Sequence, residues 1–323
     1  MTIHDYDIED NKVTAHKASI HMICDYFLFR INRENFDQCN IKKEDSYMSN
    51  KEKQKWQNNK IATKHKNLNK ISVEEQDAFS SQLQDFENLP NTSVLICVSF
   101  KLKKAYTSKG ESQFNVINGK RLENPIVRDK LTTSPMVRPS TWKGHLRFAA
   151  EKVSTLDGKK IDDTEKTTII ERLFGSESTN EKALKGRLHF FPTFFANNAE
   201  EDVITPLSRT TRTPVDGRGP ITLEVMPKGT EGDFCLLYFP YPRDETFSKE
   251  QVKTDLKFLT EALELMFFTF GFSAKKTSGF GVIEDDLTVT VWICPHEQQR
   301  FNKFNKFKEF KEYINKPWSG DHV

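Results

Sequence analysis

The chain has 323 residues, with 48 Lys and Arg against 46 Asp and Glu, so its formal net charge is +2. This length suits one large domain or two ordinary ones. The near balance of charge excludes a uniformly basic nucleic-acid coat protein, although local basic patches matter more for binding than the total. No apolar run approaches the ~20 residues that a membrane span needs, so no membrane partner is expected.

The five cysteines are widely scattered and form no CxxC pair, which argues against a structural zinc site. Their odd number and the absence of a signal peptide predict a reducing, cytoplasmic setting. The eight histidines show neither HxxxH nor HExxH spacing, so the sequence predicts no metal ligands among them.

Residues 1–91 are expected to form an N-terminal extension to a main domain that spans 92–323. Within this extension, residues 41–70 carry nine lysines against three carboxylates, a net of +6. Few large apolar residues occur there, so the segment is expected to be a solvated helix or a partly disordered arm. A contact with nucleic acid is the alternative reading of the same charges.

The main domain begins with a stretch rich in β-branched and aromatic residues over 93–105, which predicts a strand. A polar loop or hairpin is expected over 106–121. The prolines at 125, 135 and 139 then lead into a predicted helix from about residue 140 to 153. Further strands are expected within 182–195, interrupted by Pro192, and over 232–240.

The C-terminal third contains two helical patterns separated by a glycine loop. Residues 249–270 have apolar side chains at helical spacing, and Gly271 is expected to end that helix. A basic glycine loop follows and enters one or two final strands. In the last segment the phenylalanines at 301, 304, 307 and 310 share a face with Ile314, which indicates a helix whose apolar stripe packs on the core. This order predicts an α+β fold with helices on one face of an antiparallel sheet, as in ferredoxin-like folds.

The helix entrance after Pro139 combines several features of a phosphate cradle. Ser140 and Thr141 are good N-cap residues, and free N–H groups at a helix start attract anions. Lys143 and Arg147 are four residues apart and share one helix face, with Gly144 between them. An ordinary capped helix with two surface cations is the alternative reading.

Two later loops carry related chemistry. The glycine loop offers cations and hydroxyls that suit phosphates and an aromatic ring that could stack on a base; its candidate RNA-binding residues are Lys275, Lys276, Ser278, Gly279, Phe280 and Gly281. A loop over 208–227 clusters arginines that suit bidentate phosphate contacts; they are Arg209, Arg212 and Arg218.

No nucleophile–base pair can be placed in the sequence. His145 and His189 lie near the basic motifs, where the expectation is a structural role with satisfied partners. Glu123 and Asp129 are the carboxylates nearest the helix entrance. Each could be a metal ligand, a base or a turn residue.

Taken in this order, the motifs resemble those of the RAMP superfamily of CRISPR proteins, and specifically the backbone subunits of type III effector complexes. The family's acid–x–Pro element is similar to Glu123-Asn124-Pro125, and its Arg–Asp pair to Arg128-Asp129. Its Pro–Gly–Ser–Ser–Leu–Lys–Gly–x–x–Arg element looks like Pro139 to Arg147 with one glycine missing. The family's later arginine loop looks like 208–229, and its glycine-rich loop looks like 276–281. The resemblance leaves residues 1–90 unmatched.

The resemblance implies a modified ferredoxin-like, RRM-type fold and a subunit that binds CRISPR RNA. Such a subunit holds the guide backbone in an RNA-guided antiviral complex, with other subunits and complementary target RNA as partners. Target-cleaving members carry an Asp where this chain has Glu123, so an endonuclease using Glu123 with a divalent metal such as Mg²⁺ is a second hypothesis. A metal-independent guide-processing endonuclease is a third, and a ferredoxin-like protein with no RNA role is a fourth.

Overall fold

The computed structural model describes residues 89–109, 115–117, 120–122, 124–129, 134–176, 183–205, 208, 210–211, 213–214, 219–243, 247–294 and 302–316. Apart from Asp129, these residues belong to one unit of the chain, Leu83–Arg128 with Ser134–Val323. The basic arm predicted over 41–70 lies outside the described residues, as does the rest of the predicted extension up to residue 88.

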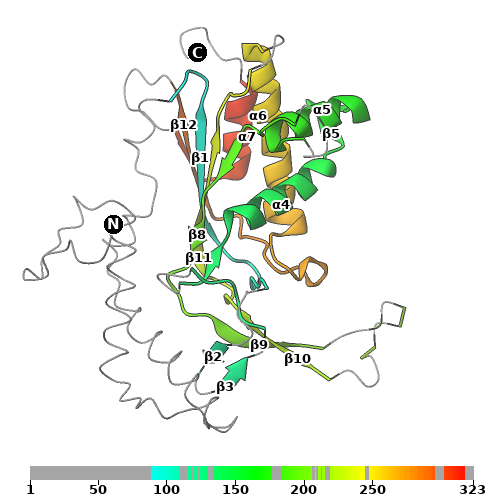
Figure 1. Ribbon diagram of the computed structural model, residues 1–323, viewed down its shortest axis with the longest axis vertical. Helices are drawn as coiled ribbons and strands as arrows, with labels where there is room; N and C mark the ends of the chain where they lie inside the picture. Colours follow the sequence, from blue (N-terminus) through cyan, green and yellow to red (C-terminus); the bar gives the residue numbers. More distant parts are fainter. Residues whose placement is uncertain are drawn as a thin grey trace, which may run out of the picture. The chain divides into compact units, whose positions relative to one another are not determined.

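The described unit is built on a five-stranded sheet with helices packed on one face (Figure 1). The sheet strands, in spatial order, are β13 (Asn302–Phe304), β12 (Thr288–Ile293), β1 (Val94–Lys101), β11 (Glu231–Tyr238) and β7 (Leu188–Phe190). Every neighbouring pair is antiparallel. The helices are α4 (Pro139–Glu151), α5 (Asp163–Phe174), α6 (Lys249–Glu264) and α7 (Phe307–Asn315).

The connectivity is that of a ferredoxin-like fold. In chain order, β1 is followed by α4, then by β7 and β11, then by α6 and β12. These four strands lie in the sheet as fourth, first, third, second, which is the arrangement of two interleaved βαβ units. The short strand β13 extends the edge beside β12. The predicted α+β fold with helices on one face is therefore confirmed.

Smaller pairs of strands complete the described unit. They are β2 (Asn115–Ile117) with β3 (Lys120–Leu122), β4 (Met136–Val137) with β8 (Thr193–Phe194), β5 (Thr155–Leu156) with β6 (Lys159–Lys160), and β9 (Glu200–Ile204) with β10 (Ile221–Val225). For the segment 106–121, predicted as a loop or hairpin, β2 and β3 form a hairpin that ends at Leu122. The predicted strand break at Pro192 is confirmed, since it lies between β7 and β8. The loop over 208–227 was expected to lead into a strand, and it does so at β10.

Alternation along β1 explains why the helices cover one face. Val94, Ile96, Val98 and Phe100 point into the main core and are at most 3% exposed. The intervening residues face the opposite side of the sheet, as side chains of a strand do at every second position. On that side a smaller apolar cluster forms, made of Leu95, Leu237, Trp292 and Cys294.

The helix predicted over 249–270 is present, but its last turn is wider than an α-helical turn. Leu265–Phe270 forms a π-helical turn, and Gly271 ends it with φ of 71°. Ser248 caps the start of α6, since its hydroxyl oxygen accepts a hydrogen bond from the backbone N–H of Gln251 at 3.1 Å. A π-helical turn inside an α-helix often marks a functional region, and here it carries the chain into the glycine loop.

The prediction of one continuous helix from residue 301 is wrong. Phe304 belongs to β13, where it lies opposite Val289, and α7 begins only at Phe307. Pairing with the edge of the sheet therefore overrides the helical spacing of the phenylalanines. The expected packing role is confirmed for Phe307, Phe310 and Ile314, which are buried in the core.

Candidate nucleic-acid interface

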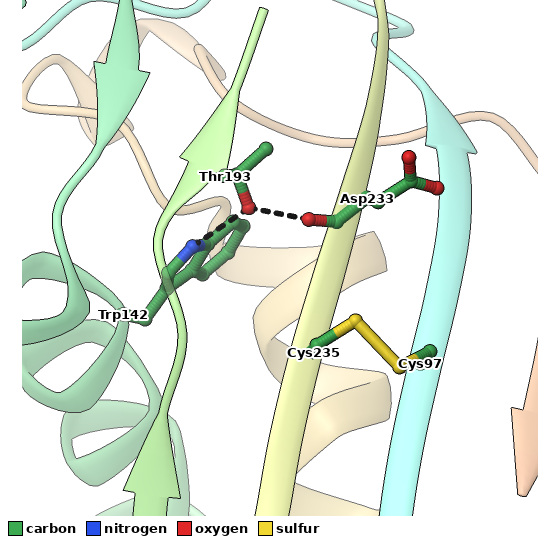
Figure 2. The surroundings of a disulfide bond; sticks show 5 residues. All are labelled: Cys97, Trp142, Thr193, Asp233 and Cys235. Atoms are coloured by element: carbon green, nitrogen blue, oxygen red, sulfur yellow. Dashed lines mark hydrogen bonds between the residues drawn. A yellow bond between two sulfur atoms is a disulfide. The ribbon is translucent and has the colours of Figure 1, made fainter. Parts of the chain in front are cut away.

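Helix α4 is anchored by its buried side, which fixes the direction of its charged side. Trp142, Leu146, Ala149 and Ala150 are fully buried. The indole N–H of Trp142 donates to the hydroxyl oxygen of Thr193 at 3.1 Å, and that hydroxyl donates to the carbonyl of Asp233 at 2.6 Å (Figure 2). The helix start is thereby tied through β8 to β11, an interior strand of the sheet.

The opposite side of α4 presents the residues that were singled out in the sequence. Ser140, Lys143 and Gly144 are exposed, and Arg147 is half-exposed. Arg147 makes one loose ion pair, 3.8 Å from Nε to Glu151 Oε1 on the next turn. A methyl group built on Gly144 would meet nothing within 4 Å, so the backbone there is open to a ligand. The two predicted cations and the glycine thus share one accessible face.

The helix starts differently from the prediction. Its N-cap is Arg138, Pro139 occupies the first helical position, and no side chain caps the first turn. Ser140 and Thr141 therefore lie inside the helix and are not caps. Thr141 N–H is bonded to the carbonyl of Arg138 at 3.0 Å. Since no hydroxyl covers the helix start, its positive end is available to an anion.

The glycine loop lies directly beside α4. Lys276 Nζ is 3.7 Å from the centroid of the Phe148 ring, which belongs to α4. His145, three residues earlier on the helix, also lies close to Lys276. Burial and then the charge of Lys276 lower the pKa of His145 to about 4, so this imidazole is neutral at pH 7. The structure therefore brings together two motifs that are about 130 residues apart in the sequence.

Lys276 is less available to a ligand than the sequence indicated. Its ammonium rests on an aromatic face, and burial lowers its pKa. Lys275 and Phe280 are half-buried, and Ser278 is exposed. Phe280 makes no ring contact with another aromatic residue in the described part of the chain.

The glycines of this loop have different roles. A methyl group on Gly281 would lie 2.6 Å from the backbone nitrogen of Ser273, and one on Gly271 would lie 2.4 Å from the carbonyl oxygen of Phe280. These two glycines allow backbone to pack on backbone inside the protein. For Gly281 the structure thus gives a packing reason for glycine, and its predicted contact with RNA stays a prediction. Gly279 differs, because its nearest neighbour would be the flexible end of Lys104 at 3.0 Å.

A pair of reciprocal hydrogen bonds fixes the start of the loop. Thr107 N–H donates to Ser273 Oγ at 3.0 Å, and Ser273 Oγ donates back to the Thr107 carbonyl at 2.9 Å. Both residues are buried. The loop is thus held against the segment that follows β1.

On the other flank of α4, Lys143 lies close to the edge strand β7. Burial, followed by the charges of Lys185 and Lys143, lowers the pKa of His189. His189 also packs edge-on against Phe239, with ring centroids 5.8 Å apart. Both histidines that adjoin the basic motifs are therefore kept neutral by burial and by neighbouring lysines.

The acid–x–Pro region is held by a carboxylate that the sequence did not reveal. Glu224 on β10 is fully buried, and its Oε2 accepts from Ile126 N–H at 2.9 Å while Arg128 donates to Oε1. The backbone N–H of Glu224 also donates to the Asn124 carbonyl at 3.0 Å. Arg128 is thus committed to a buried ion pair, which gives the family-like Arg–Asp element a structural role.

Four predicted site residues lie outside the described residues: Glu123, Arg209, Arg212 and Arg218. In the part of the chain that is described, no group of three or more His, Cys, Asp or Glu side chains is arranged to hold a metal ion.

A cavity of about 600 Å³ opens near the C-terminal end of α4. Its lining mixes lysines 152, 306 and 308 with carboxylates Glu261, Glu264 and Asp285. Because the two signs of charge alternate there, this cavity offers a polyanion less than the outer face of α4 does.

The described unit is therefore an α+β domain of the ferredoxin-like class, with a cationic face over the start of one helix and a glycine loop. The chain belongs to the RAMP superfamily, whose family pattern matches residues 106–284. This match covers the helix entrance and the glycine loop, which the sequence analysis had compared with that family.

Relatives and solved structures give more detailed similarities. The chain is 29% identical over 154 residues to a Streptococcus thermophilus protein named CRISPR system Cms endoribonuclease Csm3; the match covers 45% of this chain and 66% of the relative. A Csm3–Csm4 subcomplex of a type III-A CRISPR-Cas interference complex gives a TM-score of 0.41 at 14% identity, over 72% of this chain and 100% of that one. A type III-B Cmr-beta complex bound to cognate target RNA gives a TM-score of 0.40 at 14% identity, over 86% of this chain and 89% of that one.

None of the helices in the described ranges has the length and apolar character that crossing a membrane requires.

Proposed function

We propose that this protein is a guide-RNA-binding subunit of a type III RNA-guided CRISPR complex, and that it holds the guide by its phosphates. The main support for this proposal is the cationic face that α4 and the glycine loop share in a member of the RAMP superfamily. Lys143 and Arg147 stand on either side of Gly144, which is open to solvent. Other subunits of the complex and a complementary target RNA are the expected partners, and the cytoplasm is the expected location.

Binding of this kind depends on salt. Each cation that neutralises a phosphate of a single strand contributes about 0.7 to the slope of log affinity against log salt. The described face offers ammonium and guanidinium groups, which contact phosphates without reading bases. The sequence of the target would therefore be read by pairing with the guide, as in other RNA-guided systems.

The proposal is tested by purifying the protein from its own cells and sequencing the RNA that accompanies it. Repeat-derived guide RNA supports the proposal, and a preparation free of such RNA contradicts it. In a second measurement, a labelled single-stranded RNA is titrated at several salt concentrations. In the double variant Lys143→Gln/Arg147→Gln, the slope of log affinity against log salt should be smaller by about 1.4 than in the wild type. The matched control is Lys308→Gln on α7, whose side chain is 85% exposed and lies within an ion pair with Glu312.

A second candidate function is cleavage of the target RNA, because the Streptococcus relative is named an endoribonuclease. In this chain the proposed acid is Glu123, and Mg²⁺ is the proposed cofactor. The described part of the structure shows that the residues just after Glu123 are clamped to β10 through Glu224. Regularly spaced cuts that require a divalent metal and disappear in Glu123→Ala would support this route. Cuts of precursor RNA that persist in EDTA would instead indicate guide processing.

A further inference from the structure

The segment that follows β1 runs alongside the glycine loop. Leu102 forms a bridge with Ile283, and Gly281 N–H donates to the Ala105 carbonyl at 2.9 Å. The backbone N–H of Lys103 donates to the Val282 carbonyl at 3.0 Å. The backbone of Lys104 is thus fixed beside the loop by hydrogen bonds on both sides of it.

The side chain of Lys104 extends over Gly279. A methyl group at that glycine would lie 3.0 Å from Lys104 Nζ and 3.4 Å from its Cδ. Gly279 has φ of 75°, a conformation that favours glycine. The absence of a side chain at this position therefore leaves room for the ammonium to lie across the loop.

The ammonium of Lys104 has no ion-pair partner in the described part of the chain. Lys101, three residues earlier, pairs with Glu231 at 3.0 Å. Lys276, which the sequence suggested for the same role, is engaged by the Phe148 ring. Lys104 is exposed and remains available to an anion from outside.

We propose that Lys104 is a phosphate-binding residue of the RNA interface and supplies the cation at the glycine loop in place of Lys276. This inference rests on the proposed function and extends the cationic face from α4 across Gly279 to the end of β1. The sequence did not indicate this role, because Lys104 lies in a run of lysines at the end of a strand, where solvated charge is the ordinary interpretation.

The test uses the full-length protein and a labelled single-stranded RNA, with affinity measured between about 50 and 200 mM salt. Lys104→Gln should reduce the slope of log affinity against log salt by about 0.7 and weaken binding about 3- to 10-fold at the lowest salt. Lys104→Arg should restore the slope, since it keeps the charge. The matched control, Lys101→Gln, should leave the slope unchanged, because that lysine is already paired with Glu231.

The outcomes separate this inference from the proposed function. A wild-type slope in Lys104→Gln, together with a reduced slope in Lys143→Gln/Arg147→Gln, overturns the role of Lys104 and leaves RNA binding intact. A wild-type protein that does not bind RNA at low salt overturns both. Unchanged thermal unfolding of each variant shows that a lost contact, and not a lost fold, accounts for the result.

Discussion

Asp255 on α6 is the residue whose replacement should cost the described domain most. Its side chain is fully buried and accepts hydrogen bonds from three groups. Arg172 Nε donates at 2.8 Å, Arg187 Nη1 at 3.0 Å and the Tyr238 hydroxyl at 2.9 Å. Arg187 is itself only 1% exposed. One carboxylate thus balances two guanidinium groups, and both are largely or wholly withdrawn from water.

Asp255→Asn keeps the shape of the side chain and removes its charge. The buried guanidinium of Arg187 is then left without its counter-charge, which costs about 3–5 kcal/mol. A typical domain is stable by only about 5–15 kcal/mol, so this is a large share. For a domain of about 150–250 residues, each kcal/mol shifts Tm by about 2–4 °C, and the expected fall is about 6–20 °C.

The assay is urea unfolding followed by circular dichroism, with a thermal scan as a second measurement. Asp157→Asn is the matched control, because Asp157 pairs with Lys257 at 2.6 Å but its side chain is 53% exposed. Exposed pairs contribute at most about 1 kcal/mol. The reasoning is refuted if Asp255→Asn and Asp157→Asn lose similar amounts of free energy of unfolding. A partial recovery in Asp255→Asn/Arg187→Met would identify the unpaired charge as the cause.

Three further predictions concern stability. Burial lowers the pKa of His145 from 6.5 to about 4, so between these pH values the unfolded chain binds a proton that the folded chain does not. The free energy of unfolding should therefore fall as pH drops from about 6.5 towards 4. Urea titrations should show a smaller fall in His145→Gln. Gly281→Ala should lower the free energy of unfolding by more than about 1 kcal/mol, since φ is 77° and the added methyl meets backbone; an unchanged Tm would contradict this. Cys97 and Cys235 form a disulfide across directly opposite strand positions, 138 residues apart in sequence, although the scattered cysteines had predicted a reducing setting. Reduction of this disulfide should lower the free energy of unfolding by about 2–4 kcal/mol. Added reductant should not change the free energy of unfolding of Cys97→Ser/Cys235→Ser, and it should lower that of Cys294→Ser as much as that of the wild type.

The elements that the sequence predicted well are those whose pattern is local. Residues 94–101 are rich in β-branched and other apolar residues, and α6 shows both a serine cap and regular apolar spacing. Pro139 marked the start of α4, because proline is favoured at the first position of a helix. In each case the information lies within one segment, so a single sequence is sufficient to read it.

The elements that were missed depend on partners that are distant in the chain. Arg187 lies in the segment 182–195, for which the sequence predicted only a strand, and the carboxylate that pairs with it is 68 residues away on α6. Glu224 alternates with apolar residues on β10, as a solvent-facing strand residue does. It is buried because the segment 124–128 crosses it. The pairing of Cys97 with Cys235 likewise follows from the register of β1 and β11, which the spacing of the cysteines does not indicate.

The same limit applies to the glycines, and it affects how the proposed RNA site is interpreted. A sequence shows only that Gly144, Gly279 and Gly281 lack side chains, which fits both close internal packing and access for a ligand. In the structure, Gly281 packs closely against backbone, and Gly144 is open to a ligand. Gly279 provides the space that Lys104 fills. An RNA strand on this face would therefore pass over Gly144 and Gly279, between cations from α4 and from the end of β1. Because Lys104, Lys143 and Arg147 present ammonium and guanidinium groups there, the face would suit a ribose-phosphate chain of any sequence.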